Sequence, residues 1–159
     1  MPLTFRTELR PADRDVIRAM VESTGVFNAV ELDTAVELAD ERLAEGPASG
    51  YHFVFAEQDG QVLGYACYGP IALTVGSYDL YWIAVDKSAQ GLGLGRKIMD
   101  MVGEIIRGEG GRNIYIETST RPHYAATRGF YERCGCEQAA VLDDFYAPGD
   151  GKAIYCKRV

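Results

Sequence analysis

The segment of this sequence best suited to bind a ligand is a glycine-rich turn, Gln90-Gly91-Leu92-Gly93-Leu94-Gly95-Arg96-Lys97. It follows an apolar, strand-like run over residues 81–85 and opens a run with apolar residues at helical spacing over residues 94–105. The free N–H groups of a first helical turn and the helix dipole attract anions, and glycines let phosphate oxygens come close to the backbone. Arg96 and Lys97 add two positive charges beside these donors. The turn therefore predicts a phosphate site, and the alternative is a flexible surface turn.

The spacing of the glycines excludes two common phosphate-binding loops. The dinucleotide pattern Gly-x-Gly-x-x-Gly requires a third glycine where this chain has Arg96 or Ile98. The nucleoside triphosphate loop requires lysine after its last glycine and then serine or threonine, but here Arg96 follows Gly95 and Ile98 follows Lys97. The pattern that fits is Gln-x-x-Gly-x-Gly, formed by Gln90, Gly93 and Gly95.

A second strand and helix lie downstream of this turn. Residues 113–118 are strand-like, and the helical run over residues 125–135 contains Phe130-Tyr131-x-Arg133-x-Gly135. With both segments in this order, the chain resembles the GNAT superfamily of acyl-CoA-dependent N-acetyltransferases. The first segment is similar to that family's pyrophosphate loop, and the second is similar to its Phe-Tyr-x-[Lys/Arg]-x-Gly-Phe signature.

Two positions depart from the family pattern. Tyr124 stands where the family frequently has an asparagine that contacts the pantetheine arm, and Cys136 replaces the aromatic residue that closes the signature. The first departure concerns a cofactor contact, so the resemblance leaves that contact to be tested. The second concerns packing.

The resemblance implies transfer of an acetyl group from acetyl-CoA, as co-substrate, to a primary amine by direct attack. Tyr131 would be the general acid that protonates the departing CoA thiolate, since a phenol is protonated at pH 7. Backbone groups of the strand before the turn would pair with the pantetheine arm. The cofactor-binding residues implied are Ile83, Ala84, Val85, Gln90, Gly91, Leu92, Gly93, Leu94, Gly95, Arg96, Tyr124 and Tyr131.

Glu117 is the candidate general base. It comes late in the strand-like run over residues 113–118, on the side opposite Ile114 and Ile116. A carboxylate at a strand end beside a cleft is well placed to take the proton of an incoming ammonium, directly or through water. Asp79 and Tyr81, on the preceding strand, are the alternatives, and a solvated or salt-bridged Glu117 without a catalytic role is a further one.

Composition sets the class of protein. The chain has 159 residues, 47% hydrophobic and 25% charged, which suits one globular domain over residues 1–159. Its net charge of −7 disfavours nucleic acid as a partner, and no apolar run reaches the length of a membrane span. The four cysteines show no metal-ligand spacing, so we expect no metal and reduced thiols in a cytoplasmic protein.

The periodicity predicts an α/β fold with the element order βααβββαβαββ, which matches the GNAT arrangement: a mixed, mainly antiparallel twisted sheet of about seven strands with helices on both faces. In the second helix, capped by Asn28, we expect Val30, Ala35, Val36, Leu38, Ala39 and Leu43 to form the apolar stripe. The predicted strands cover residues 3–9, 51–57, 61–69, 77–85, 113–118, 136–142 and 152–158, and the predicted helices cover residues 11–23, 28–45, 93–107 and 125–135.

Several alternatives remain at this stage. A non-catalytic acyl-CoA-binding or sensor module is the second interpretation, and a phosphate site for another nucleotide is the third. The connection over residues 143–151 carries aromatic and acidic side chains, which favours the rim of an amine pocket or a dimer contact. An exposed edge on the last strand is compatible with a homodimer.

Overall fold

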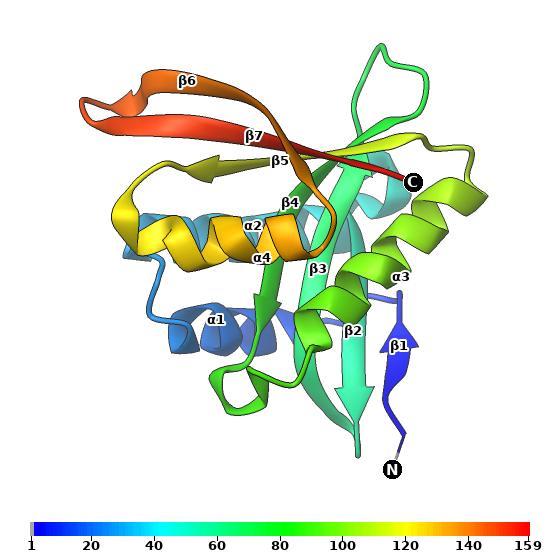
Figure 1. The fold of residues 1–159 in the computed structure, drawn as a ribbon. Helices are drawn as coiled ribbons and strands as arrows, with labels where there is room; N and C mark the ends of the chain where they lie inside the picture. Colours follow the sequence, from blue (N-terminus) through cyan, green and yellow to red (C-terminus); the bar gives the residue numbers. More distant parts are fainter. Residues whose placement is uncertain (1) are drawn as a thin grey trace. The chain divides into compact units, whose positions relative to one another are not determined.

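The computed structural model describes residues 2–159, which form seven strands and four α-helices in the predicted order βααβββαβαββ (Figure 1). The expected fold class, a mixed and mostly antiparallel α/β sheet, is confirmed. The elements are β1 Thr4–Arg6, α1 Asp13–Ser23, α2 Ala29–Glu45, β2 His52–Gln58, β3 Gln61–Pro70, β4 Ser77–Val85, α3 Leu94–Gly108, β5 Asn113–Ser119, α4 Ala125–Arg133, β6 Glu137–Ala147 and β7 Asp150–Arg158.

The strands follow the order β1-β2-β3-β4-β5-β7-β6 in one sheet. The pair β4–β5 is parallel, whereas β1–β2, β2–β3, β5–β7 and β6–β7 are antiparallel. By their contacts the residues divide into two compact units, described in turn below. The first contains the residues up to Gly69 together with Trp82–Val102, and the second contains Pro70–Tyr81 and Gly103–Val159.

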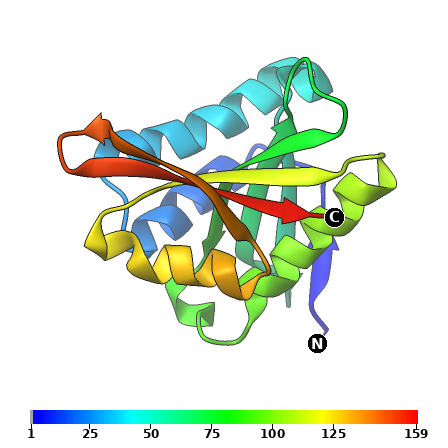
Figure 2. The ribbon, with the colours of Figure 1, turned by 45° about the horizontal axis from the view of Figure 1, so that its top comes forward.

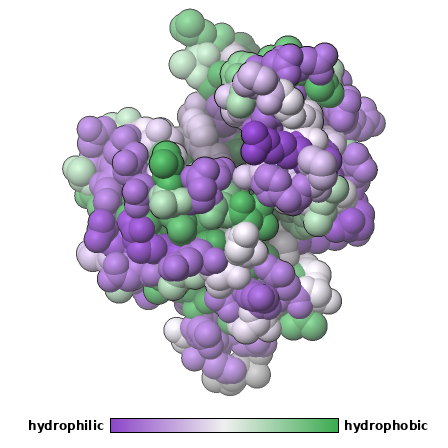
Figure 3. Space-filling model, turned by 90° about the vertical axis from the view of Figure 1, so that its left-hand side faces the viewer, coloured by the Kyte–Doolittle hydropathy of each residue, from purple (hydrophilic) through white to green (hydrophobic). Residues whose placement is uncertain are grey.

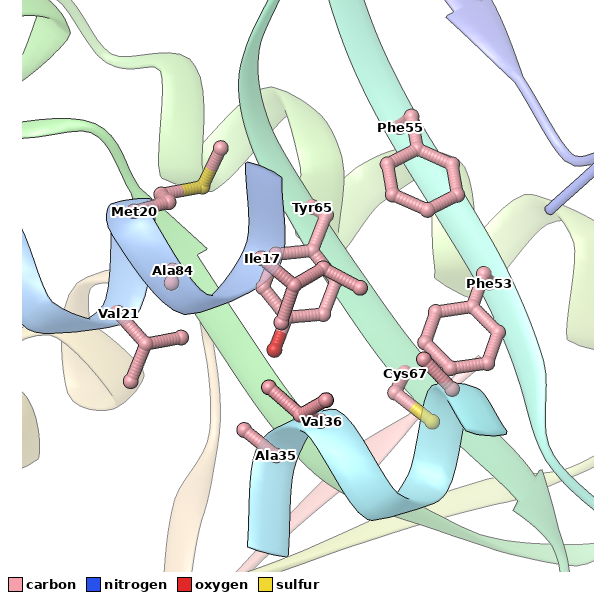
Figure 4. Close-up of a cluster of buried hydrophobic side chains, with 11 residues drawn as sticks. Ile17, Met20, Val21, Ala35, Val36, Phe53, Phe55, Tyr65, Cys67 and Ala84 are labelled. Carbon is pink, nitrogen blue, oxygen red and sulfur yellow. The ribbon is translucent and has the colours of Figure 1, made fainter. Parts of the chain in front are cut away.

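The core of the first unit is built by α1 and α2 against β2 and β3 (Figure 4). Ile17, Met20 and Val21 of α1 are buried, as the helical spacing predicts. In α2 the buried residues are Ala35, Val36 and Ala39. The strands contribute stacked aromatic rings: those of Phe53 and Phe55 are 5.9 Å apart, and those of Phe55 and Tyr65 are 6.0 Å apart.

Two predictions for this unit are wrong in detail. Val30 and Leu43 do not belong to the apolar stripe of α2, because they are 73% and 37% exposed. Leu32 packs against the core, in register with the buried residues at i+3, i+4 and i+7. The first strand is only Thr4–Arg6. The guanidinium of Arg6, its last residue, donates to both carboxylate oxygens of Asp13, at 2.7 and 2.9 Å, which ties the strand to α1.

Local signals fixed the helix start and the hairpin in this unit. Asn28 caps α2 in a capping box, with its side chain accepting from the amide of Glu31 and the Glu31 side chain accepting from the amide of Asn28. The β2–β3 hairpin turns through Asp59 and Gly60, which have φ of 53° and 76°. Both are left-handed, as a type I′ turn requires.

The hydroxyl of Tyr65 is buried without a hydrogen-bond partner in the core of the first unit, where Figure 4 shows the ring among Ile17, Val36 and Cys67. An unsatisfied buried hydroxyl costs about 1–3 kcal/mol. We therefore expect Tyr65→Phe to raise the free energy of unfolding by about 1 kcal/mol in urea titrations. Tyr155→Phe is the matched control: its hydroxyl donates to Glu132 at 3.2 Å, so its loss should lower stability. A destabilised Tyr65→Phe variant would show that the hydroxyl is satisfied.

The second unit contains the β5–β7–β6 part of the sheet and α4, which packs on β7 through the rings of Tyr131 and Tyr155, 6.0 Å apart. Two predictions are wrong here. Residues 143–147 are not a loop, because β6 runs on to Ala147 and returns through a tight turn at Pro148 and Gly149. The last strand, β7, is not an edge, because it lies between β5 and β6, and β6 forms the edge.

Hydrophilic residues cover most of the face shown in Figure 3, with hydrophobic residues exposed between them. The larger exposed hydrophobic side chains include Leu73, Val75 and Leu92. None of the helices in the part of the chain that the structure describes combines the length and the apolar character needed to cross a membrane.

Candidate functional site

The glycine turn is an exposed connection between β4 and the N-terminus of α3 (Figure 2). Gly91 and Gly93 have φ of 81° and 76°, the left-handed region that favours glycine. The carbonyl of Gly93 accepts from the amide of Lys97 at 3.2 Å, which starts the helix. The preceding amides of the first turn, from Leu94 to Arg96, have no intrahelical acceptor by geometry. They are donors for an anion at the positive end of the dipole.

The start of the turn is anchored on β4. Gln90 donates from Nε2 to the carbonyl of Val85 at 3.2 Å, so the first residue of the predicted motif closes the turn on the strand end. Asp86 caps the short helical turn Lys87–Ala89 by accepting from the amide of Ser88. The side chains of Gln90 and Asp86 thus stabilise the start of the turn. Arg96 and Lys97 are exposed, so their positive charges lie at the surface.

β4 supplies the backbone next to the turn. It pairs in parallel with β5 over four residues, Ser77–Leu80 with Asn113–Ile116, and both strands continue beyond the last pair. In the continuation of β4, Ala84 is 5% exposed and packs in the core of the first unit. Ile83 and Val85 are half-buried, and they are the residues whose backbone was predicted to contact a pantetheine arm.

Tyr131 is a buried residue of α4, 7% exposed. Its ring is 5.5 Å from that of Phe130 and 6.0 Å from that of Tyr155. Burial raises the pKa of the Tyr131 phenol above its usual value, and the nearby Cys136 and Cys134 raise the pKa further. The group therefore keeps its proton throughout the neutral and mildly alkaline range.

Tyr124 precedes this helix, as the last residue of the short turn Pro122–Tyr124 and the N-cap of α4. It is half-buried, and its ring is 4.4 Å from that of His123. It has no side-chain cap hydrogen bond to α4. The residue that replaces the family's asparagine is thus a bulkier aromatic side chain at the start of the helix that carries Tyr131.

Glu117 and Asp79 project from the same side of the second unit's sheet. Asp79 pairs with Tyr115 in register, and Glu117 follows Tyr115 by two residues on β5. As predicted, Ile114 and Ile116 are buried on the other side. Burial raises the pKa of the Asp79 carboxyl, and the neighbouring Glu117 adds to the rise. A carboxylate of raised pKa is a stronger base than a solvated one.

Sequence reasoning missed Lys152 of β7, which belongs to this group. Its Nζ is 3.0 Å from Oε2 of Glu117 and 3.6 Å from the centre of the Phe145 ring. Its side chain is 11% exposed, whereas that of Glu117 is 51% exposed. Nothing in the periodicity singled out this lysine, since the pairing of β7 with β5 brings it to Glu117. Glu117 is thus paired with a lysine in the structure, and its part in catalysis stays a prediction.

A metal site does not emerge from these residues. Within residues 2–159 no group of three or more His, Cys, Asp or Glu side chains could hold a metal ion. None of the four cysteines forms a disulfide within the part of the chain that the structure describes, and Cys67, Cys134 and Cys136 are buried.

The comparison with protein families decides what kind of protein carries this arrangement. The model of the acetyltransferase (GNAT) family matches residues 17–136, which include the glycine turn and α4. The chain belongs to the GNAT acetyltransferase family. As a GNAT acetyltransferase it is an acyltransferase by family, as the two motifs predicted. None of the curated proteins matches this sequence.

Solved structures agree with the family. A GNAT-family protein from Desulfovibrio desulfuricans is 50% identical over 99% of both chains, with a TM-score of 0.96. The ribosomal-protein-S18-alanine N-acetyltransferase from Escherichia coli is 18% identical, with a TM-score of 0.76. The match covers 99% of this chain and 94% of that enzyme's chain. The yncA protein from Salmonella typhimurium, solved with acetyl-CoA, is 19% identical over 99% of this chain and 94% of its own, with a TM-score of 0.73. The last two show the fold alone.

Proposed function

We propose that this GNAT acetyltransferase transfers an acetyl group from acetyl-CoA to a primary amine. The observation that carries the proposal is the exposed glycine turn at the start of α3, where free helical amides, two left-handed glycines and the cations Arg96 and Lys97 meet. These groups fit a diphosphate, which needs several donors and positive charge at close approach. The acetyl-CoA in the yncA structure supports the choice of ligand. In this proposal residues 1–159 act as one acetyltransferase domain.

The residues of the turn hold the diphosphate in this proposal. Amides from Gly91 to Arg96 donate to its oxygens, and Gln90 holds the turn through Val85. Backbone groups of Ile83, Ala84 and Val85 pair with the amides of the pantetheine arm, and Tyr124 contacts that arm with its ring. Acetyl-CoA, when bound, supplies a thioester whose carbonyl carbon the amine attacks.

Three proton transfers accompany the reaction. A general base, Glu117 in the first instance with Asp79 and Tyr81 as alternatives, takes a proton from the acceptor's ammonium and leaves a nucleophilic amine. The amine nitrogen forms a bond to the acetyl carbon, and the carbon–sulfur bond breaks. Tyr131 donates its phenolic proton to the departing thiolate, and the nitrogen, positively charged after its attack, passes its second proton to the Tyr131 phenolate, which restores the phenol. The products are the acetylated amine and free CoA.

A non-catalytic acyl-CoA-binding module is the second candidate, since Tyr124 departs from the family's pantetheine contact. The test is release of free thiol from acetyl-CoA in the presence of a panel of primary amines, with the product identified by a mass increase of one acetyl group. Thiol release with an acetylated product supports the transferase. Thermal stabilisation by CoA but not by ATP or NAD, without turnover of any amine, would support the binding module. Equal stabilisation by ATP would argue for a different nucleotide.

A further inference from the structure

Lys152 is a charged side chain held in an unusual place. Lysine is rarely buried unless its charge is compensated, yet the Lys152 side chain is 11% exposed on β7, where Lys152 pairs with Ser119 at the end of β5 and with Leu142 of β6. Two groups compensate the positive charge of its Nζ: the Glu117 carboxylate, whose Oε2 is 3.0 Å away, and the face of the Phe145 ring, whose centre is 3.6 Å away. The Tyr146 ring lies farther away, at 5.9 Å. A cation over an aromatic face and beside a carboxylate is well stabilised.

A β-bulge brings Phe145 over this ammonium. The register of β6 on β7 pairs Leu142 with Lys152 and Ala147 with Asp150, so five steps along β6 span two along β7. Asp144 sits in this bulge with φ of 55°, and its Oδ1 accepts from the amide of Gly149 at 2.8 Å. Bulges of this kind redirect side chains and are frequent beside active sites. Here the extra residues place an aromatic ring on a buried cation.

The charges around Lys152 do not cancel. Within the second unit, Asp79 of β4 and Glu117 of β5 face it from two strands, so two carboxylates share one ammonium. The raised pKa of Asp79 follows from its burial and from Glu117, and Lys152 acts in the opposite direction. Without the ammonium, the pKa of Asp79 would rise further, because Lys152 is the neighbour that lowers it.

We propose that Lys152, held under the Phe145 ring, is a positioning residue for amine acetylation: its ammonium fixes the Glu117 carboxylate in place on the side of the sheet from which Asp79 also projects. This inference rests on the proposed function, because it concerns the carboxylates that serve the amine. The pair of carboxylates with one resident cation then carries one net negative charge. That charge suits an acceptor that arrives as an ammonium ion.

The test is a comparison of Lys152→Met, Lys152→Gln and Lys152→Arg with the wild type. The side-chain carboxyl of Asp79 is titrated by carbon NMR without ligands, and kcat/KM for the best amine is measured from pH 5.5 to 9. In the Met and Gln variants we expect the Asp79 midpoint and the acidic limb of kcat/KM to move up by about one pH unit, since a positive neighbour is lost. Relative to the wild type, kcat/KM should be reduced most at the acidic end of this range, by up to about tenfold for a shift of one pH unit. Lys152→Arg should restore both midpoints.

The controls separate this role from a general change of charge or stability. Arg107→Met removes one positive charge from an exposed pair with Glu104 on α3 and should leave both midpoints unchanged. Unshifted midpoints in a folded Met or Gln variant would overturn the inference, as would a shifted Asp79 titration with an unchanged kcat/KM profile. Absence of turnover by the wild type with every amine would instead refute the proposed function, and the inference with it.

Discussion

Tyr131→Phe should lower kcat by about 100-fold while leaving the affinity for CoA unchanged. General acids contribute roughly 10²–10⁴-fold, and we expect the low end because a thiolate is already a good leaving group and burial raises the pKa of this phenol. The raised pKa of Tyr131 also determines how the effect of the substitution on kcat depends on pH. A group whose pKa is raised from about 10 stays protonated from pH 6 to 9, so the ratio of wild-type to variant kcat should be constant across that range.

Steady-state kinetics with the best amine and calorimetric titration with CoA measure the two quantities. Tyr155→Phe is the matched control, since it removes the hydroxyl of a neighbouring buried tyrosine that we place outside the chemistry. It should change kcat by no more than about threefold. A Tyr131→Phe variant with the kcat of the wild type would show that Tyr131 packs in the core and is not the general acid. A ratio that changes with pH would show that another group supplies the proton.

Gly93→Ala should raise the KM for acetyl-CoA at least about tenfold. At φ of 76° a Cβ atom adds strain of roughly 1–2 kcal/mol, yet no protein atom lies within 4 Å of where it would stand. The protein therefore has room for the methyl group, and the group that it would obstruct is a phosphate drawn to the neighbouring amides. The KM for the amine should be less affected.

Gly110→Ala supplies the control for strain alone. Gly110 lies in the turn after α3 with φ of 88°, and here too no atom lies within 4 Å of the position that a methyl group would occupy. The two variants should lose similar stability in urea titrations, but only Gly93→Ala should lose affinity for acetyl-CoA. Equal KM values of the two variants for acetyl-CoA would show that the glycine turn does not bind the phosphates.

Most of the fold could be predicted from local signals in the sequence. The Asn28 capping box, the Asp59-Gly60 turn and the alternation of Ile114, Ile116 and Glu117 each act over a few neighbouring residues, so they can be recognised without tertiary structure. Val30 shows the limit of this reasoning. It has an apolar side chain in a helical run, but which side of α2 is buried was decided by packing against α1 and the sheet.

The sequence by itself determined the family, the element order and the glycine turn, because spacing within one segment dictates backbone geometry and the free amides of a helix start. Only the tertiary structure decided the surroundings of the candidate base. Glu117 and Lys152 are far apart in the chain, and the pairing of β5 with β7 puts their charges 3.0 Å apart. The bulge in β6 then places the Phe145 ring over the Lys152 ammonium. Register and bulges depend on the pairing of distant segments, which no local pattern encodes.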